Sequence, residues 1–418
     1  MAGDDVDERD LAALVVARVG SVEETGDVWQ PYRLSDVAGG SVVAVTAFLA
    51  ELQASGRSAA TQRSYAMDLL RWFRFLWAVE VPWGRATRVE ARDFCRWLTL
   101  CDKPAPGGRV ASAAAGAGGV RNPVTGKPTL ARTYAPATRA HCETVVRGFY
   151  TFHQEAGSGP MVNPFPLVAQ RREGRAHAHH NPMEPWRQER SGRYRPRLAQ
   201  RIPRCIPDER FNQLFAELGS HRDRALVSLW VSTGARAAEL LGARCGDIDA
   251  GQQLVTVVRK GSRAVQQLPA SPDAFVWVRL YQCTLDASTP VGRDDPVWWT
   301  LRRPLRPLTY PAARAMFTRA NQKLGANWSL HDLRHTAAHR MARDPQLPLS
   351  DVQWVLGHAH LSTTQLYLTP IPSEVIAGVL AHHRRVPDGA PSWPAHDCAG
   401  AGEYRAETLD TLFGRRPS

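Results

Sequence analysis

Apolar residues recur at helical spacing through the first part of the chain. Between residues 42 and 100, several are separated by three or four positions and therefore share one helix face: Tyr65, Leu69, Trp72, Phe73 and Leu76. A second helical stretch covers residues 137–156 and follows Pro136, a residue type favoured at the first position of a helix. The segment between them, residues 103–134, is rich in glycine, alanine and proline, which predicts a flexible insertion. The pattern predicts a small helical domain with one interruption.

The second part of the chain combines helical patterns with one short run of β-branched residues. Residues 222–241 are expected to be helical, with a break at Thr233-Gly234. Residues 254–258 have the composition of a strand, and residues 264–268 are expected to pair with them across the turn 259–263. Further helices are expected at residues 311–324, 330–342, 349–356 and 363–367. The predicted fold class is mainly α with a small β-sheet.

These patterns divide the chain into five segments. They are an N-terminal extension (1–41), a helical domain (42–168), an arginine-rich linker (169–205), a second domain with the small sheet (206–385) and a tail (386–418). The linker has many arginines and prolines but no apolar period, so we expect it to lie along a phosphate backbone. In the tail, Leu409, Leu412 and Phe413 predict a short helix that docks on its own domain or on a neighbouring subunit.

The net charge of the chain indicates what kind of partner it binds. The 418 residues carry a formal net charge of +12, with a sequence pI near 9.8, which favours a polyanionic partner such as nucleic acid. Almost all of the positive charge is arginine, and the lysines are Lys103, Lys127, Lys260 and Lys323. Because lysine is so rare here, its presence in the predicted turn 259–263 indicates a specific role for Lys260.

The cysteines and the N-terminal residues indicate the compartment. The seven cysteines include no close pair of the CxxC type: Cys95, Cys101, Cys142, Cys205, Cys245, Cys283 and Cys398. This pattern predicts neither a disulfide framework nor a zinc ribbon, and it favours a reducing cytoplasm. The acidic start and the absence of a long apolar run predict a soluble protein of the cytoplasm, associated with the nucleoid and not with a membrane.

Six polar residues carry the candidate chemistry. In chain order they are Arg236, Lys260, His331, Arg334, His358 and Tyr367. Cations and imidazoles of this kind gather around a phosphate, and the final phenol supplies a nucleophile. The spacing of Arg236 and Glu239 predicts a pair on one helix face, and His331 and Arg334 are also one turn apart. The set predicts phosphoryl transfer from DNA to tyrosine.

The order of these residues, together with Thr233-Gly234-Ala235-Arg236, His331-Asp332-Leu333-Arg334-His335 and Leu356-Gly357-His358, resembles the tyrosine recombinases of the phage integrase and Xer-like family. The resemblance extends from about residue 42 to 367 and includes Thr61, Tyr65, Asp68 and Leu69 as a helical signature. It implies a helical, SAM-like core-binding domain and an α+β catalytic domain that close around duplex DNA as a C-shaped clamp.

The resemblance also implies a role for each residue. Tyr367 attacks the scissile phosphate and forms a 3′-phosphotyrosyl link, while Arg236 and Arg334 hold the non-bridging oxygens. Lys260 protonates the leaving 5′ oxygen, His331 helps to deprotonate the tyrosine, and His358 binds the phosphate. No metal and no cofactor are implied, and a homotetramer assembles on double-stranded DNA.

Physical chemistry supports this reaction independently. A free tyrosine has a pKa of about 10, so it is a poor nucleophile at neutral pH unless cations and a base favour its phenolate. The phosphotyrosyl bond also stores the energy of the broken DNA bond, so a different 5′-hydroxyl can reverse the step without ATP. The reaction therefore suits strand exchange between two DNA sites.

Several alternatives compete with the recombinase reading. The stripe His331, His335 and His339 suggests a metal site, but it lacks a suitably placed carboxylate. A catalytically inactive DNA-binding protein would share the scaffold, and a type IB topoisomerase would share the chemistry. Tyr404 is the other tyrosine near the C-terminus, but no histidine lies beside it.

The long insertion and the basic linker favour an integrase or transposase of a mobile element over an Xer-like protein that resolves chromosome or plasmid dimers. Arg259 precedes Lys260 where many relatives have glycine, so this chain departs from the family pattern at the lysine turn.

Overall fold

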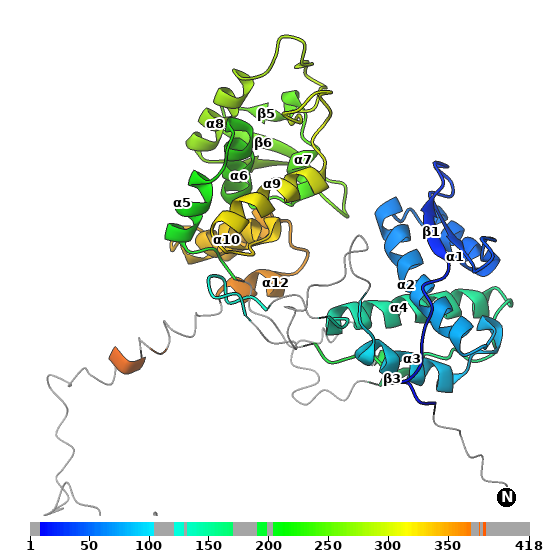
Figure 1. Cartoon of the computed structure of the whole chain (residues 1–418). Helices are drawn as coiled ribbons and strands as arrows, with labels where there is room; N and C mark the ends of the chain where they lie inside the picture. The colour runs from blue at the N-terminus through cyan, green and yellow to red at the C-terminus, as the bar shows by residue number, and fades with distance from the viewer. Residues whose placement is uncertain are drawn as a thin grey trace, which may run out of the picture. The chain divides into compact units, whose positions relative to one another are not determined.

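The computed structural model describes residues 9–103, 121–128, 132–169, 190–198, 204–368, 376 and 379–381. The chain divides into two compact units, which are described separately (Figure 1). Unit 1 comprises Met1–Arg201, Asn212–Leu218 and Pro311–Ser329. Unit 2 comprises Ile202–Phe211, Gly219–Tyr310 and Leu330–Ser418. Helices α5 (Asp208–Ala216) and α9 (Tyr310–Lys323) include residues of both units.

Four helices build most of unit 1: α1 (Val43–Ala54), α2 (Ala59–Ala78), α3 (Arg88–Leu100) and α4 (Pro136–Glu155), with the short 3-10 turn η1 (Trp83–Arg85). Helix α2 is central and packs against the other three. Local sequence sets where the helices begin. Ser58 accepts a hydrogen bond from the Thr61 amide at the start of α2, and Thr87 with Glu90 forms a capping box at the start of α3.

The core of unit 1 is aromatic. Its largest fully buried side chains include Trp72, Phe75, Phe94, Phe149, Tyr150 and Phe165. The Trp72 ring meets Phe94 edge to face at a centroid distance of 5.0 Å, and its Nε1 donates to the Tyr150 hydroxyl at 3.0 Å. Each buried aromatic side chain removes a large apolar area from water, so this cluster is the main source of stability in the unit.

Segments outside the predicted helical domain also belong to unit 1. Strands β1 (Ser21–Glu24) and β2 (Tyr32–Ser35) form an antiparallel hairpin beside α2, and Leu11 and Leu34 are buried in the aromatic core. The predicted extension therefore contributes to the core. Strand β4 (Arg190–Gly192), within the predicted linker, pairs with β3 (Leu167–Ala169). Residues 170–189 and 199–203 of the predicted linker, and the tail 386–418, lie outside the described residues.

Unit 2 combines helices with one small sheet. After the start of α5 come α6 (His221–Thr233), α7 (Ala237–Leu241), the 3-10 turn η3 (Cys245–Asp247), and the antiparallel sheet of β5 (Ile248–Asp249), β6 (Leu254–Val258) and β7 (Val265–Pro269). Helices α8 (Pro272–Gln282), α10 (Leu330–Arg343), α11 (Leu349–Leu356) and α12 (Leu361–Gln365) follow, with η4 (Leu366–Leu368) at the end.

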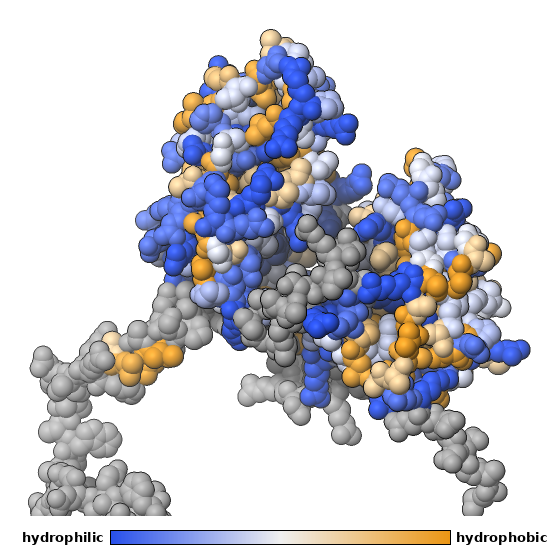
Figure 2. Space-filling model, in the orientation of Figure 1, coloured by the Kyte–Doolittle hydropathy of each residue, from blue (hydrophilic) through white to orange (hydrophobic). Residues whose placement is uncertain are grey.

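Helix α6 is the centre of unit 2. It is almost entirely buried and packs against α8 and α10 (Figure 1). Its C-terminus therefore lies inside the unit, where the site residues gather. The Tyr281 ring of α8 stacks on Trp298 at 5.7 Å, and its hydroxyl accepts from the Trp299 amide at 3.0 Å. On the face shown in Figure 2, hydrophilic residues are interspersed with small apolar areas.

The predicted fold class is confirmed. The predicted helices of both parts are present, the break at Thr233-Gly234 separates α6 from α7, and β6 pairs with β7 across the predicted turn. The β1–β2 hairpin and α8 were not predicted. Within the described ranges, no helix combines the length and the apolar character needed to cross a membrane.

The aromatic core predicts a large stability loss on truncation of Trp72. Replacing Trp72 by alanine is expected to lower the free energy of unfolding by about 3–5 kcal/mol, because it opens a cavity and leaves the Tyr150 hydroxyl without its donor. Urea unfolding followed by circular dichroism measures the loss. The matched control is Trp29→Ala, since Trp29 is 78% exposed and its loss is expected to cost less than about 0.5 kcal/mol. Equal losses for both variants would contradict this packing.

Candidate active site

The corner between α6 and α7 places the first predicted site residue. Helix α6 ends at Gly234, whose φ of +63° lies in the left-handed region that favours glycine. A Cβ at this position would lie 2.8 Å from Cδ2 of Leu356, so the corner also requires the absence of a side chain. The chain then turns into α7 with Arg236 at the N-cap position. The glycine break therefore lies against the C-terminal end of α11, and Arg236 follows it two residues later.

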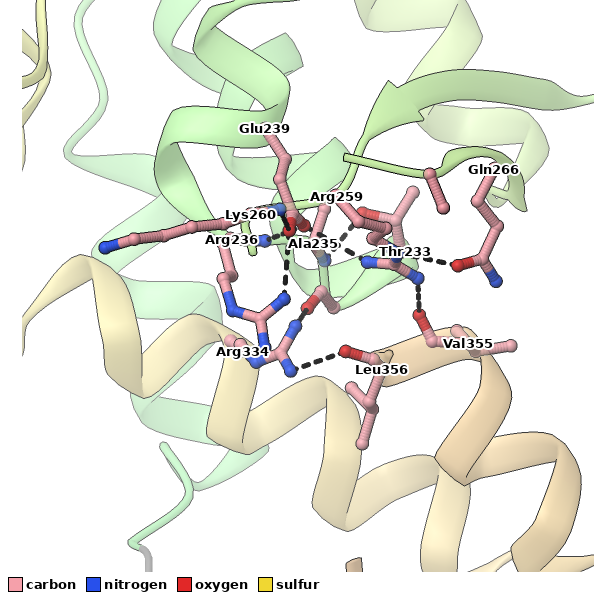
Figure 3. Close-up of polar contacts among 12 residues, drawn as sticks. Thr233, Ala235, Arg236, Glu239, Arg259, Lys260, Gln266, Arg334, Val355 and Leu356 are labelled. Carbon is pink, nitrogen blue, oxygen red and sulfur yellow. Dashed lines mark hydrogen bonds and ion pairs between the residues drawn. The ribbon is translucent and has the colours of Figure 1, made fainter. Parts of the chain in front are cut away.

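The carboxylate of Glu239 organises the surrounding donors (Figure 3). It accepts from the Arg236 amide at 2.9 Å, from Arg236 Nη1 at 2.9 Å, from Arg259 Nη1 at 3.1 Å and from the Lys260 amide at 3.1 Å. Its side chain is 1% exposed. Burial raises the pKa of Glu239, but hydrogen bonds from the Arg236 and Lys260 amides outweigh it, and the pKa is lowered overall. The predicted pair of Arg236 and Glu239 is confirmed.

Arg334 lies deeper, at 3% exposure. Its Nη1 donates to the Gly234 carbonyl at 2.7 Å, its Nη2 donates to the Leu356 carbonyl at 2.6 Å, and Nη2 lies 3.0 Å from His358 Nε2. These acceptors are neutral and do not compensate the guanidinium charge. Burial and the nearby charge of Arg236 lower the pKa of Arg334 to about 10. A buried cation held by neutral groups favours the binding of an anion.

The tautomer of His358 follows from its partners. A guanidinium has no acceptor, so Nε2 of His358 must accept from Arg334, and Nδ1 donates to Oγ1 of Thr364 at 2.9 Å. The ring is therefore neutral. Burial, followed by the charges of Arg334, Arg236 and Arg259, lowers the pKa of His358 to about 4. The histidine follows Gly357, which ends α11 with a φ of +61°, as predicted.

The nucleophile candidate Tyr367 lies in η4 and is 6% exposed. Its ring packs with Ala338, Val352 and Leu356, and it stacks on His358 at a centroid distance of 6.2 Å. Burial raises the pKa of Tyr367, and the charge of Arg334 acts against that shift. The phenol is therefore protonated at neutral pH, and a base is needed to activate it.

The hydroxyl of this phenol is within hydrogen-bond distance of His335. Its Nδ1 lies 2.8 Å from the Tyr367 hydroxyl. His331, one turn earlier on α10, is exposed, and its ring lies edge to face on His335 at 4.3 Å. From sequence, His335 belongs to the metal stripe and to the motif that begins at His331, but not to the predicted set of site residues. Its spacing of four from His331 was the available signal, because residues i and i+4 share a helix face. The role predicted for His331 stays a prediction.

Lys260 lies in the turn between β6 and β7, as predicted. Its amide is fixed by Glu239, while its exposed side chain extends away from that carboxylate (Figure 3). The preceding residue, Arg259, is 4% exposed and contacts α11. The structure therefore brings the hairpin, the α6–α7 corner and the C-terminal end of α11 together. All six predicted residues lie in unit 2.

Unit 1 has a hollow between α2 and α4, and its lining includes the polar side chains of Arg63, Arg71, Thr138 and His141. Asp68, from the predicted helical signature, is buried here and accepts from His141 Nδ1 at 2.6 Å. Burial raises the pKa of Asp68 even though Arg71 and His141 oppose the shift. Among the residues that the structure describes, no group of three or more potential ligands could hold a metal ion.

The environment of His358 predicts a pH dependence of stability. The folded protein keeps this histidine neutral down to a pH of about 4, whereas the unfolded chain binds a proton below about 6.5. The contribution of His358 to the unfolding free energy is therefore present above pH 6.5 and is lost as the pH falls toward 4, by about 1–3 kcal/mol. Urea unfolding of the wild type and of His358→Gln at pH 7, 6, 5 and 4 measures it. The difference between the two proteins should shrink with falling pH, and His360→Gln, which changes an exposed histidine, is the control. A constant difference would contradict the neutral ring.

Comparison with known sequences agrees with this geometry. The model of the phage integrase family matches residues 206–373. Tyrosine recombinase XerC of Serratia marcescens is 32% identical over 226 residues, which cover 50% of this chain and 67% of the relative. Tyrosine recombinase XerD of Neisseria meningitidis serogroup B is 28% identical over 193 residues, or 45% of this chain and 65% of the relative. The chain therefore spans about two thirds of the length of these curated relatives.

Solved structures share the fold. The Tn1549 transposon integrase, in complex with circular intermediate DNA, has a TM-score of 0.51 at 14% identity and covers 81% of this chain and 98% of that chain. A lambda integrase dimer bound to a COC′ core site has a TM-score of 0.50 at 14% identity, with coverages of 78% and 76%. With the candidate site residues gathered in unit 2 and a XerC relative matched over two thirds of its length, the chain belongs to the tyrosine recombinase family of the phage integrase type.

Proposed function

We propose that this protein is a site-specific DNA recombinase that cleaves and rejoins duplex DNA through a 3′-phosphotyrosyl intermediate. The observation that carries the proposal is the buried Tyr367 phenol, which contacts His335 in the same cluster as the uncompensated guanidinium of Arg334. A nucleophile, a base and an anion-binding cation are thus held together by α10, α11 and η4. Residues 42–168 serve as the core-binding domain and residues 206–385 as the catalytic domain in this proposal.

Each proton in the proposed reaction has a donor and an acceptor. The Tyr367 oxygen forms a bond to the scissile phosphorus, and the bond from phosphorus to the 5′ oxygen breaks. His335 accepts the phenol proton, and Lys260 donates a proton to the leaving 5′ oxygen. Arg236 and Arg334 stabilise the negative charge on the non-bridging oxygens.

His358 acts on the phosphate through Arg334 in this arrangement. Its neutral Nε2 accepts from the guanidinium and so orients it. Direct contact with a phosphate oxygen requires a proton on Nε2. The negative charge of a bound phosphate favours that proton, because a nearby anion raises the pKa of a histidine. His358 can therefore change from an acceptor for Arg334 to a donor for the substrate.

Double-stranded DNA is the proposed substrate. The net charge of +12 suits a phosphate backbone, and the hollow between α2 and α4 offers Arg63 and His141 for phosphate contacts in unit 1. The solved relatives named above are complexes with DNA. Exchange between two duplexes needs four cleavages, so we propose a homotetramer on DNA that acts at the nucleoid.

For the biological role we propose the integration or transposition of a mobile element. The predicted insertion and linker support this role, as does the shared fold of the transposon integrase. The XerC and XerD relatives favour a second candidate, the resolution of chromosome or plasmid dimers. Cleavage of a series of overlapping duplexes that cover the DNA on both sides of the gene would distinguish the two roles. Cleavage at the border of a mobile element would identify integration or transposition.

The nucleophile assignment predicts the loss of one covalent product. With these overlapping duplexes, the wild type is expected to form a protein–DNA adduct that survives denaturing electrophoresis, and Tyr367→Phe is expected to form none while binding DNA normally. Tyr310→Phe, which changes a tyrosine that is 50% exposed, serves as the control. An adduct formed by Tyr367→Phe would refute the assignment. Relaxation of supercoiled plasmids without any site dependence would instead favour a type IB topoisomerase.

The contact between His335 and Tyr367 predicts which histidine activates the phenol. His335→Ala is expected to slow adduct formation by about 10²–10⁴-fold at neutral pH, because general base catalysis contributes that much. The rate should recover in part with added imidazole and at higher pH, where the phenol ionises without help. His339→Ala, one turn further along α10, is the control. A larger loss in His331→Ala than in His335→Ala would return the role of base to His331.

A further inference from the structure

We infer that Arg259 is a positioning residue that couples the hairpin carrying Lys260 to the end of α11 that carries His358. The inference rests on the proposed function, because it assigns Lys260 to the leaving group. Arg259 itself has no place in the reaction written above. It stands directly before the lysine in the chain, within the turn that joins β6 to β7.

The first observation is the burial of the Arg259 guanidinium, which is 4% exposed and bonded in three directions (Figure 3). Nε donates to Oε1 of Gln266 at 2.6 Å, Nη1 donates to Oε2 of Glu239 at 3.1 Å, and Nη2 donates to the Val355 carbonyl. The three acceptors belong to β7, α7 and α11. One side chain therefore connects three separate elements of the catalytic unit.

The second observation concerns the C-terminal end of α11. The last carbonyls of a helix lack partners within the helix and carry partial negative charge. Here Gln266 Nε2 donates to the Trp354 carbonyl at 3.0 Å, Arg259 donates to the next carbonyl and Arg334 to the one after. Two of these three donors come from the β6–β7 hairpin. The hairpin thus caps the helix whose next turn carries His358.

The third observation is the fit at Gly357. A Cβ on this glycine would lie 3.1 Å from Nε and 3.2 Å from Cζ of Arg259. The guanidinium therefore occupies the space beside the turn that leads from α11 to His358. Lys260 is held from the other side, since its amide shares the Glu239 carboxylate with Nη1 of Arg259. The position of Lys260 relative to the phosphate-binding residues consequently depends on Arg259.

A change of leaving group tests this coupling. In a duplex with sulfur in place of the 5′ bridging oxygen at the scissile phosphate, the leaving group is a thiolate. A thiolate departs without a proton because its conjugate thiol is far more acidic than an alcohol. A defect in the placement of Lys260 is therefore bypassed, whereas a defect in phosphate binding or in Tyr367 is not. The probe is the duplex that the wild type cleaves, synthesised with oxygen or with sulfur.

Arg259→Gln is expected to slow adduct formation on the oxygen duplex by at least about tenfold and on the sulfur duplex by less than about threefold, within the range that general acid catalysis contributes. Arg259→Lys should behave similarly, because one ammonium cannot reach all three acceptors. Arg263→Gln removes the same charge from an exposed residue of the same turn and should leave both rates near wild type. The slowing factor is the wild-type rate divided by the rate of the variant on the same duplex. If this factor for Arg259→Gln on the oxygen duplex is less than about three times its value on the sulfur duplex, the coupling is overturned. An unchanged rate on the oxygen duplex also overturns it.

Two further variants keep the test decisive. If Arg259→Gln does not fold, as judged by circular dichroism, the same criterion applies to Gln266→Leu, which removes one partner of Arg259 and one cap of α11. Lys260→Ala calibrates the probe. If Lys260→Ala stays slow on the sulfur duplex, the role proposed for Lys260 is refuted. If Lys260→Ala regains its rate on the sulfur duplex but Arg259→Gln does not, only the coupling is refuted.

Discussion

The candidate site in unit 2 depends on one buried carboxylate, that of Glu239. Glu239 collects two backbone amides and two guanidinium groups, and so joins α7 to the hairpin that carries Lys260. Its burial would favour protonation, but the donors around it hold the carboxylate ionised. Loss of this charge would leave the Arg259 cation buried without its counter-charge, which is costly in a protein interior. The placement of the surrounding cations therefore follows from this single acceptor.

The C-terminal end of α11 is the second organising element. Its last carbonyls point at donors from the hairpin and from α10, and the helix then turns at Gly357 toward His358 and Tyr367. Because these carbonyls carry partial negative charge, they attract the arginines and orient them. The same end of the helix packs against Gly234, where a side chain would collide with Leu356. Gly234 thus lies against both Arg334 and Leu356, and Gly357 leaves room for Arg259.

The electrostatics of the cluster suit an incoming phosphate. Arg334 is buried without a counter-charge from its bonded partners. Burial, together with this positive charge, lowers the pKa of His358 and keeps its ring neutral. Tyr367 is buried, and burial raises the pKa of its phenol, so the proposed nucleophile is held in its protonated form. A phosphate would supply the missing negative charge, and His335 is in position to take the phenol proton. The arrangement therefore links activation of the tyrosine to the arrival of the substrate.

Local sequence was sufficient to predict most of the helices, the β6–β7 hairpin, the breaks at Gly234 and Gly357 and the pair of Arg236 with Glu239. Periodicity, turn residues and i, i+3 spacing act over a few residues, so they can be recognised without the tertiary structure. Tertiary structure decided the rest. His335, not identified as a site residue from sequence, meets Tyr367 across 32 positions, and Arg259 meets Val355 across 96. The β1–β2 hairpin and Leu34 join the core of unit 1 for the same reason. Such contacts depend on how distant segments pack, which local patterns do not record.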